Sequence, residues 1–154
     1  MTTNTIIAEN KEHLIELIEY EIQLQGNACD LNFIDVANVK DMSRIFQNSK
    51  FNGDISLWNV SNVKDMTSMF ENSRFDKNIS NWNVCNVIHM GRMFAKSQFN
   101  GDISKWNVSS LIIMNGMFQS CIFNGNISNW DVSSVRIMDH LFYESRFNGD
   151  ISQW

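Results

Sequence analysis

The feature that most constrains this chain is a repeat of 24 residues. Phenylalanine recurs in one register and tryptophan in another, and stretches such as FNGDISLWNV at residues 51–60 return with small changes. Self-similarity at a fixed period of this size is typical of solenoids, in which each repeat stacks on the next. The sequence therefore predicts a solenoid. The two registers are Phe51, Phe75, Phe99, Phe123 and Phe147, and Trp58, Trp82, Trp106, Trp130 and Trp154.

The spacing of the apolar positions changes along each repeat. Trp58 and Val60 alternate with Asn59, as expected for a short strand with two side chains facing a core. From Val63 to Phe70 the apolar residues instead fall at i, i+3, i+6 and i+7, as on one stripe of a helix of about three turns. The pattern predicts a strand–turn–helix unit. Its apolar positions are Ile55, Trp58, Val60, Val63, Met66, Met69 and Phe70.

The repeat begins near Asp30, because DLNFIDVANVKDMSRIFQNSK at residues 30–50 keeps the apolar register. We therefore expect an N-terminal cap over residues 1–29. A repeat solenoid follows over residues 30–154, with about five 24-residue units plus a partial terminal strand.

The cap is predicted to be a helix over residues 10–25. Leu14 and Leu17 lie on a helical stripe, and Gly26 stands where a helix would end. The terminal unit of a solenoid must cover an open apolar cross-section, which this stripe could do. Residues 20–24 also alternate apolar and polar side chains, so a capping strand is an alternative.

The unit MF-x-x-S-x-F-N-G-D-I-S-x-W-N-V-S-N-V-x-x-M resembles the short repeat of bacterial surface proteins and lipoproteins related to the BspA-like leucine-rich-repeat group. That group's AF-x-x-C step is echoed by Met117–Cys121 and its L-x-x-I-x-L step by Ile103–Val108. The resemblance covers residues 30–154 and implies a leucine-rich-repeat-like, right-handed α/β solenoid. It differs in two respects, since the chain has no proline and its N-terminus has no export signal or lipid-anchoring cysteine.

Composition narrows the partners and the compartment. A net charge of -5 without a basic stripe argues against nucleic acid. No run of about 18 apolar residues is present for membrane insertion. The N-terminus lacks the basic and apolar regions of a secretory signal, so a cytoplasmic location is expected. The resemblance leaves the cell surface or secretion as the alternative.

No pattern of chemically active residues predicts an enzyme. Each cysteine fills a position that holds a small residue in other repeats, which favours structural thiols, and the histidines fall in unrelated repeat positions. The sequence contains no glycine-rich phosphate loop and no Ser-His-Asp order. We expect no catalytic residues, no metal and no cofactor. The cysteines are Cys29, Cys85 and Cys121, and the histidines are His13, His89 and His140.

Three recurring patterns each have a structural and a functional interpretation. The tryptophans could pack in the core or stack on sugars. Paired methionines such as Met66 and Met69 could fill the core or bind Cu(I). Asp54, Asp102 and Asp150 could form turns or hold calcium, although Asn78 and Asn126 replace them in alternate repeats. The structural interpretation is favoured in all three.

The leading functional hypothesis is a non-enzymatic scaffold that binds a protein partner through the outward side chains of the strand segment. The first outward column varies among repeats, as a recognition surface should, whereas the second is always Asn or Asp and more plausibly satisfies backbone groups in a ladder. The alternative is a surface adhesin or carbohydrate-binding repeat protein. The first column is Phe33, Leu57, Asn81, Lys105, Asn129 and Gln153; the second is Asp35, Asn59, Asn83, Asn107 and Asp131.

The C-terminal repeat is expected to leave apolar surface uncovered. A terminal unit exposes one cross-section and one strand edge. We therefore expect a weak C-terminal end-to-end homodimer, or fraying of residues 147–154. The exposed set would include Phe123, Ile127, Trp130 and Met138, partly covered by Phe147, Ile151 and Trp154.

Overall fold

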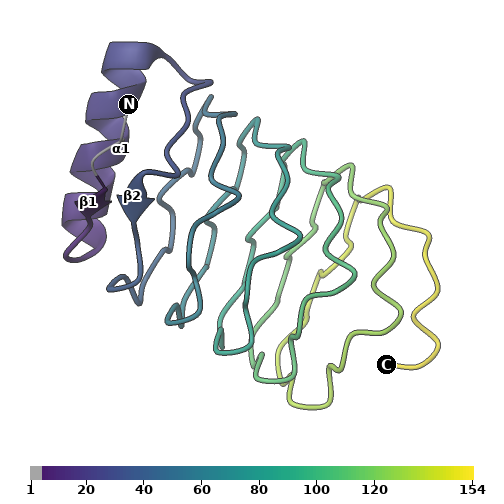
Figure 1. Ribbon diagram of the computed structural model, residues 1–154. Coiled ribbons are helices and arrows are strands. Elements are labelled where there is room, and N and C mark those ends of the chain that lie inside the picture. The colour runs from purple at the N-terminus through teal and green to yellow at the C-terminus, as the bar shows by residue number, and fades with distance from the viewer. Residues whose placement is uncertain (1–4) are drawn as a thin grey trace.

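The computed structural model describes residues 5–154 and contains three regular elements, shown in Figure 1. These are strand β1 (Ile6–Ile7), helix α1 (Lys11–Gln25) and strand β2 (Ile34–Asp35). β1 pairs in parallel with β2, with Ile6 opposite Ile34. After β2 the chain winds in successive coils that stack from α1 towards the C-terminus.

Helix α1 lies across the N-terminal end of the stack of coils (Figure 1). It begins at the N-cap Asn10, whose side chain accepts a hydrogen bond from the His13 N–H, and it ends at Gly26 with φ 88°. Leu14 and Ile18 are buried in the same core as the coils. The helix runs through residues 20–24, so the alternative of a capping strand there is wrong.

The helix predicted in every repeat is absent from residues 30–154. In a helix each N–H donates to the carbonyl four residues earlier. Here alternate N–H groups donate to the next coil instead: Met66 N–H to His89 O at 2.8 Å and Phe70 N–H to Met93 O at 2.9 Å. The N–H groups between them close tight turns, as from Met69 to Met66 O at 3.2 Å. A series of turns, and not a helix, therefore produces the three-residue spacing of the apolar side chains between Val63 and Met69.

Left-handed backbone conformations make these turns. Within residues 5–154, nine residues other than glycine have φ between 52° and 64°, and Gly116 has φ 59° at one equivalent position. Such a residue reverses the local chain direction, so a helix cannot propagate through it. Two recur in almost every coil. The nine are Arg44, Asn48, Ser68, Asn72, Arg92, Lys96, Ser120, His140 and Glu144.

The strand predicted around Trp58 and Val60 is also absent. The Trp58 N–H closes a turn onto Ile55 O at 3.2 Å, so this segment bends instead of extending. Parallel pairing between coils lies further along the repeat, after Val63 and its equivalents. It joins Asp41 to Asp65, Asp65 to His89, His89 to Ile113 and Ile113 to Ile137, with one more bridge from Asp30 to Asp54.

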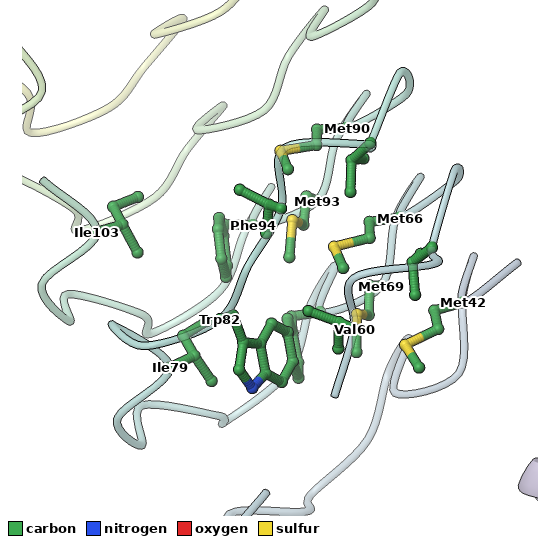
Figure 2. Packing of buried hydrophobic residues seen from close by; sticks show 14 of the residues in the cluster. Met42, Val60, Met66, Met69, Ile79, Trp82, Met90, Met93, Phe94 and Ile103 are labelled. Carbon is green, nitrogen blue, oxygen red and sulfur yellow. The ribbon is translucent and has the colours of Figure 1, made fainter. Parts of the chain in front are cut away.

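The core consists of columns in which each side chain packs on its copies in adjacent coils. Phe51 stacks on Phe75 with ring centroids 6.3 Å apart, and Phe70 stacks on Phe94 at 5.8 Å. Figure 2 shows the methionine columns and the aromatic rings pointing into the same interior. Met66, Met69, Met90 and Met93 are fully buried, as the core interpretation predicted.

The repeat unit is therefore a coil of turns stabilised by hydrogen bonds to its neighbours, in place of the predicted strand–turn–helix unit. We propose to class the stack as a solenoid. Its right-handedness, its relation to leucine-rich repeats and the domain boundary at residues 29 and 30 remain predictions.

Candidate interaction surface

The first predicted outward column faces solvent along most of its length. The Leu57 side chain is 77% exposed, whereas Phe33 is half-buried and packs against the core. The remaining members, Asn81, Lys105, Asn129 and Gln153, are exposed and polar. Together with the second column, these residues are called the outward face below.

The second column mainly stabilises turns. Asn59 Oδ1 accepts hydrogen bonds from the Ser61 N–H at 3.2 Å and the Ser61 hydroxyl at 2.7 Å. Each other member likewise accepts from the backbone N–H two residues later: Asp35, Asn83, Asn107 and Asp131. The column thus satisfies backbone N–H groups, as expected from the sequence, and each of these bonds lies within one coil.

The recurring aspartates of the F-N-G-D step have the same role. Asp54 accepts from the Ser56 N–H at 2.9 Å, and this hydrogen bond is the main cause of the lowered pKa of Asp54. Asn78 makes the equivalent bond to Ser80 at 3.0 Å without a charge. Within residues 5–154 no three His, Cys, Asp or Glu side chains gather to hold a metal ion. The turn interpretation is thus correct for these positions.

A groove of about 480 Å³ adjoins Phe33 and Leu57 at the end of the outward face near α1. It forms because the Ile6 N–H donates to Phe33 O at 3.0 Å, which fixes the β1 segment beside the first coil. Asn32 Oδ1 accepts from the Leu57 N–H at 2.8 Å and holds the next coil in place. The groove is lined by Thr5, Gln25, Asp30, Asn32, Phe33 and Leu57.

The groove combines apolar and anionic character. Phe33 and Leu57 supply the apolar walls, and Asp30 is the ionisable residue among the lining side chains. Asp30 also accepts from the Asn32 N–H at 2.8 Å, which orients its carboxylate. Sequence analysis identified Phe33 and Leu57 but missed the other four lining residues, because α1, β1 and two coils come together only in the folded chain.

The tryptophan column belongs to the core. Trp58, Trp82, Trp106 and Trp130 are each at most 4% exposed, so their rings are not available for stacking on sugars. Each indole Nε1–H donates to a backbone carbonyl of the preceding coil, as Trp82 does to Ile55 O at 3.2 Å. This bond was not predicted, although the recurrence of tryptophan in place of other aromatic residues is the signal that could have indicated it.

The candidate reactive residues are cysteines and histidines, and they differ in burial and in the groups they contact. Cys29 and Cys121 are buried, and burial raises the pKa of both thiols, which disfavours the nucleophilic thiolate. His89 Nδ1 lies 3.5 Å from Asp65 Oδ2 on the paired segment between coils. His140 packs edge-on against Tyr143.

A second groove, of about 530 Å³, adjoins the segment that carries the parallel bridges. Ile112 and Arg136 line it together with serines from two adjacent coils. At the equivalent of Ile112, earlier coils carry Lys40 and Lys64. None of the lining residues belongs to the outward face.

Comparison with known protein families finds a match over most of the chain. The family model described as "Mycoplasma protein of unknown function, DUF285" matches residues 18–121 and 95–154. No curated protein matches the chain, and no solved structure does. Among residues 5–154 no helix is long and apolar enough to cross a membrane.

Proposed function

The chain belongs to the DUF285 family, and we propose that it is a non-enzymatic scaffold that binds a protein partner through the outward face. The observation that carries this proposal is the exposed Leu57 side chain beside the groove that Phe33 lines. A large apolar side chain next to a partly apolar groove is the arrangement that supplies an anchor in many protein interfaces.

Differences among the coils support a specific role for Leu57. Equivalent positions later in the stack carry Asn81, Lys105 and Asn129, so the fold does not require leucine there. The partner would place an apolar side chain against Phe33 and Leu57, and a lysine or arginine near Asp30. Its remaining contacts would be polar, along the later members of the first column.

The resemblance to the BspA-like surface proteins supports a variant of this proposal in which the scaffold acts on the cell surface as an adhesin. Buried tryptophans remove the stacking surface on which the carbohydrate-binding hypothesis depended. Fractionation of native cells distinguishes a cytoplasmic location from surface display.

Exchange of residues between equivalent repeat positions tests the outward face with little change to the fold. Leu57→Asn and Lys105→Asn introduce the residue found at positions 81 and 129. Ile112→Lys is the matched control, because it introduces the residue of Lys64 at a position outside the two columns of the outward face. Wild-type protein and the variants serve as bait in native lysate, with mass spectrometry of the captured proteins.

We expect a protein retained by wild type and by Ile112→Lys to be lost from the double variant Leu57→Asn, Lys105→Asn. The melting temperatures of all three proteins should agree closely. Retention of the same protein by the double variant would contradict the proposal, and so would a parallel loss of binding and melting temperature.

A further inference from the structure

Helix α1 carries apolar side chains on two of its sides. Leu14 and Ile18 are buried in the same core as the coils. Tyr20 and Leu24 lie on a different side of the helix, where their side chains are 62% and 66% exposed. A surface helix typically has one apolar stripe towards its core and polar residues elsewhere, so a second apolar side indicates a second packing partner.

The exposed residues follow one ridge of the helix. Four exposed side chains are spaced four residues apart and therefore lie in one row along the helix surface, which we call the outer row. It consists of Glu12, Glu16, Tyr20 and Leu24. A groove of about 340 Å³ beside the C-terminal half of the row is lined by Tyr20, Gln23 and Leu24. The row is about 18 Å long, the length of roughly three helical turns.

The N-terminal half of the outer row is anionic. Helix α1 contains four glutamates and one lysine. The ammonium group of that lysine, Lys11, contacts Asp41 Oδ2 at 3.1 Å on the first coil, so it is engaged away from the outer row. Along the helix the row thus presents two carboxylates, followed one turn later by two apolar side chains.

These features indicate a helix as the occupant. The backbone N–H and carbonyl groups of α1 bond within the helix, so this side binds a partner through side chains and not by strand addition. Two helices pack when the ridge of one fits into a groove of the other. A second copy of α1 would bring glutamates close to glutamates, whereas a helix with cations beyond its apolar residues is attracted by the same carboxylates.

We propose that the outer row binds an amphipathic helix of another protein, which runs antiparallel to α1 and has the pattern Leu-x-x-x-Leu-x-x-x-Lys-x-x-x-Lys, with similar apolar residues or arginine as equivalents. Its apolar pair packs on Leu24 and Tyr20, and its cations face Glu16 and Glu12. The antiparallel direction opposes the two helix dipoles and places the cations in the C-terminal half of the partner helix, where they are favourable. The mode is that of a helix laid into a groove, with anchors one turn apart.

Titration of the full-length protein with a synthetic peptide, followed by amide NMR, tests this proposal. The probe is an alanine-based peptide of about 20 residues that carries the pattern and is long enough to form a helix. We expect saturable shifts at the amides of the outer row and of Gln23. The Kd should rise with added salt, because salt screens the ion pairs. A peptide of the same composition, with leucine and lysine alternating along its row, should bind about tenfold more weakly because it places lysine at Tyr20.

Protein variants separate the apolar from the ionic part of the site. Leu24→Ala should weaken binding of the probe by about tenfold, because it removes an anchor. Glu16→Lys should weaken it by about threefold to tenfold, and a peptide with glutamate in place of lysine should bind this variant more tightly than wild type. Glu144→Lys is the matched control: it makes the same change of charge near the opposite end of the stack, introduces the residue of Lys96 and should bind the probe unchanged.

The outward face and the outer row share no residue, so the two proposals can fail separately. The double variant Leu57→Asn, Lys105→Asn should bind the probe as wild type does. Shifts confined to amides outside α1 would place the site elsewhere and overturn the proposal. Equal weakening by Glu16→Lys and Glu144→Lys would also overturn it, since the attraction would then depend on net charge alone. Shifts of the outer row that grow with protein concentration in the absence of peptide would identify a second copy as the occupant instead.

Discussion

Trp82 illustrates why single positions recur so exactly in this chain. Its ring packs between coils, with its centroid 6.3 Å from that of Phe70, and its Nε1–H donates to Ile55 O. Phenylalanine could fill much of the space but could not donate this bond. Ile55 O would then keep only the bond from the Trp58 N–H, and the loss of the indole hydrogen bond costs about 0.5–1.5 kcal/mol. This double requirement explains tryptophan at five equivalent positions.

The carboxylate of Glu71 makes hydrogen bonds to the coils on both sides of its own. Burial acts to raise the pKa of Glu71, but hydrogen bonds from Arg92, Ser68 and Gln47 outweigh it, so the pKa is lower than usual. Gln47 lies one coil earlier and donates to Glu71 Oε2 at 3.0 Å, while Arg92 lies one coil later and donates from Nε at 3.0 Å. The carboxylate thus links three coils.

Acidification should weaken this link. A carboxyl with a lowered pKa in the folded state stabilises the protein above its unfolded pKa, about 4.3 for glutamate, and loses that contribution as the pH falls through the folded pKa. We expect Glu71→Gln to make the free energy of unfolding less dependent on pH below about 4.5 than in wild type. Urea unfolding between pH 3 and 7 measures this, with Glu19→Gln on the exposed side of α1 as control. Superimposable pH profiles of wild type and Glu71→Gln would contradict the expectation.

At the scale of elements, the coil replaces both the strand and the helix as the unit of this protein. Residues in the left-handed conformation direct alternate N–H groups towards the next coil, whose carbonyl oxygens accept their hydrogen bonds. A helix would satisfy the same groups internally and leave the coils joined by side chains alone. Each coil thus depends on its neighbours for its backbone hydrogen bonds, as expected of a repeat that is not stable in isolation.

Substitution of a left-handed residue by glycine distinguishes a coil from a helix. Arg44 has φ 64° and an exposed side chain. The left-handed conformation costs a non-glycine residue about 1–2 kcal/mol, so Arg44→Gly should leave the free energy of unfolding unchanged or raise it by up to about 1 kcal/mol. The matched change Glu16→Gly in α1 should lower it by about 1 kcal/mol. Chemical denaturation measures both, and an equal loss would indicate a helix at Arg44.

At the scale of the whole molecule, the two ends of the stack differ. Helix α1 covers one end with Leu14 and Ile18, whereas the coil at residues 131–154 has exposed Ile137, Met138 and Tyr143. A single apolar cluster runs from Ala8 to Leu141 without interruption. The free energy of unfolding of such a stack is close to a sum of terms between neighbouring coils. The contact of α1 with the first coil therefore stabilises the protein in the same way as the contact between two coils.

Leu14 should therefore contribute as much to the free energy of unfolding as a buried residue in the middle of the stack. We expect Leu14→Ala to lower the free energy of unfolding by about 2–5 kcal/mol, because it removes buried methyl groups and leaves a cavity. Leu24→Ala, on a side chain that is 66% exposed, should change it by less than about 0.5 kcal/mol. Both are measured from denaturant midpoints. Similar effects of the two substitutions would show that α1 does not contribute to the core.

The sequence by itself determined the period and the identity of the core. These followed because, in a stack, every residue meets its own equivalent in the neighbouring coils. A position that recurs as phenylalanine, tryptophan or methionine then forms an apolar column, and those columns are buried. The outward orientation of Leu57 and Lys105 followed from the alternation of inward and outward side chains around the tryptophan of each repeat.

The tertiary structure alone decided the backbone path within the repeat. Spacing of three residues between Val63, Met66 and Met69 fits both a helix and a series of turns, because each places every third side chain on one side. What separates them is the acceptor of each N–H, four residues back or one coil onward, and an onward acceptor exists only when the next coil is in place. The groove at Phe33 and Leu57 likewise exists only in the folded chain, since its walls come from Thr5 beside β1, from the end of α1 and from two consecutive coils.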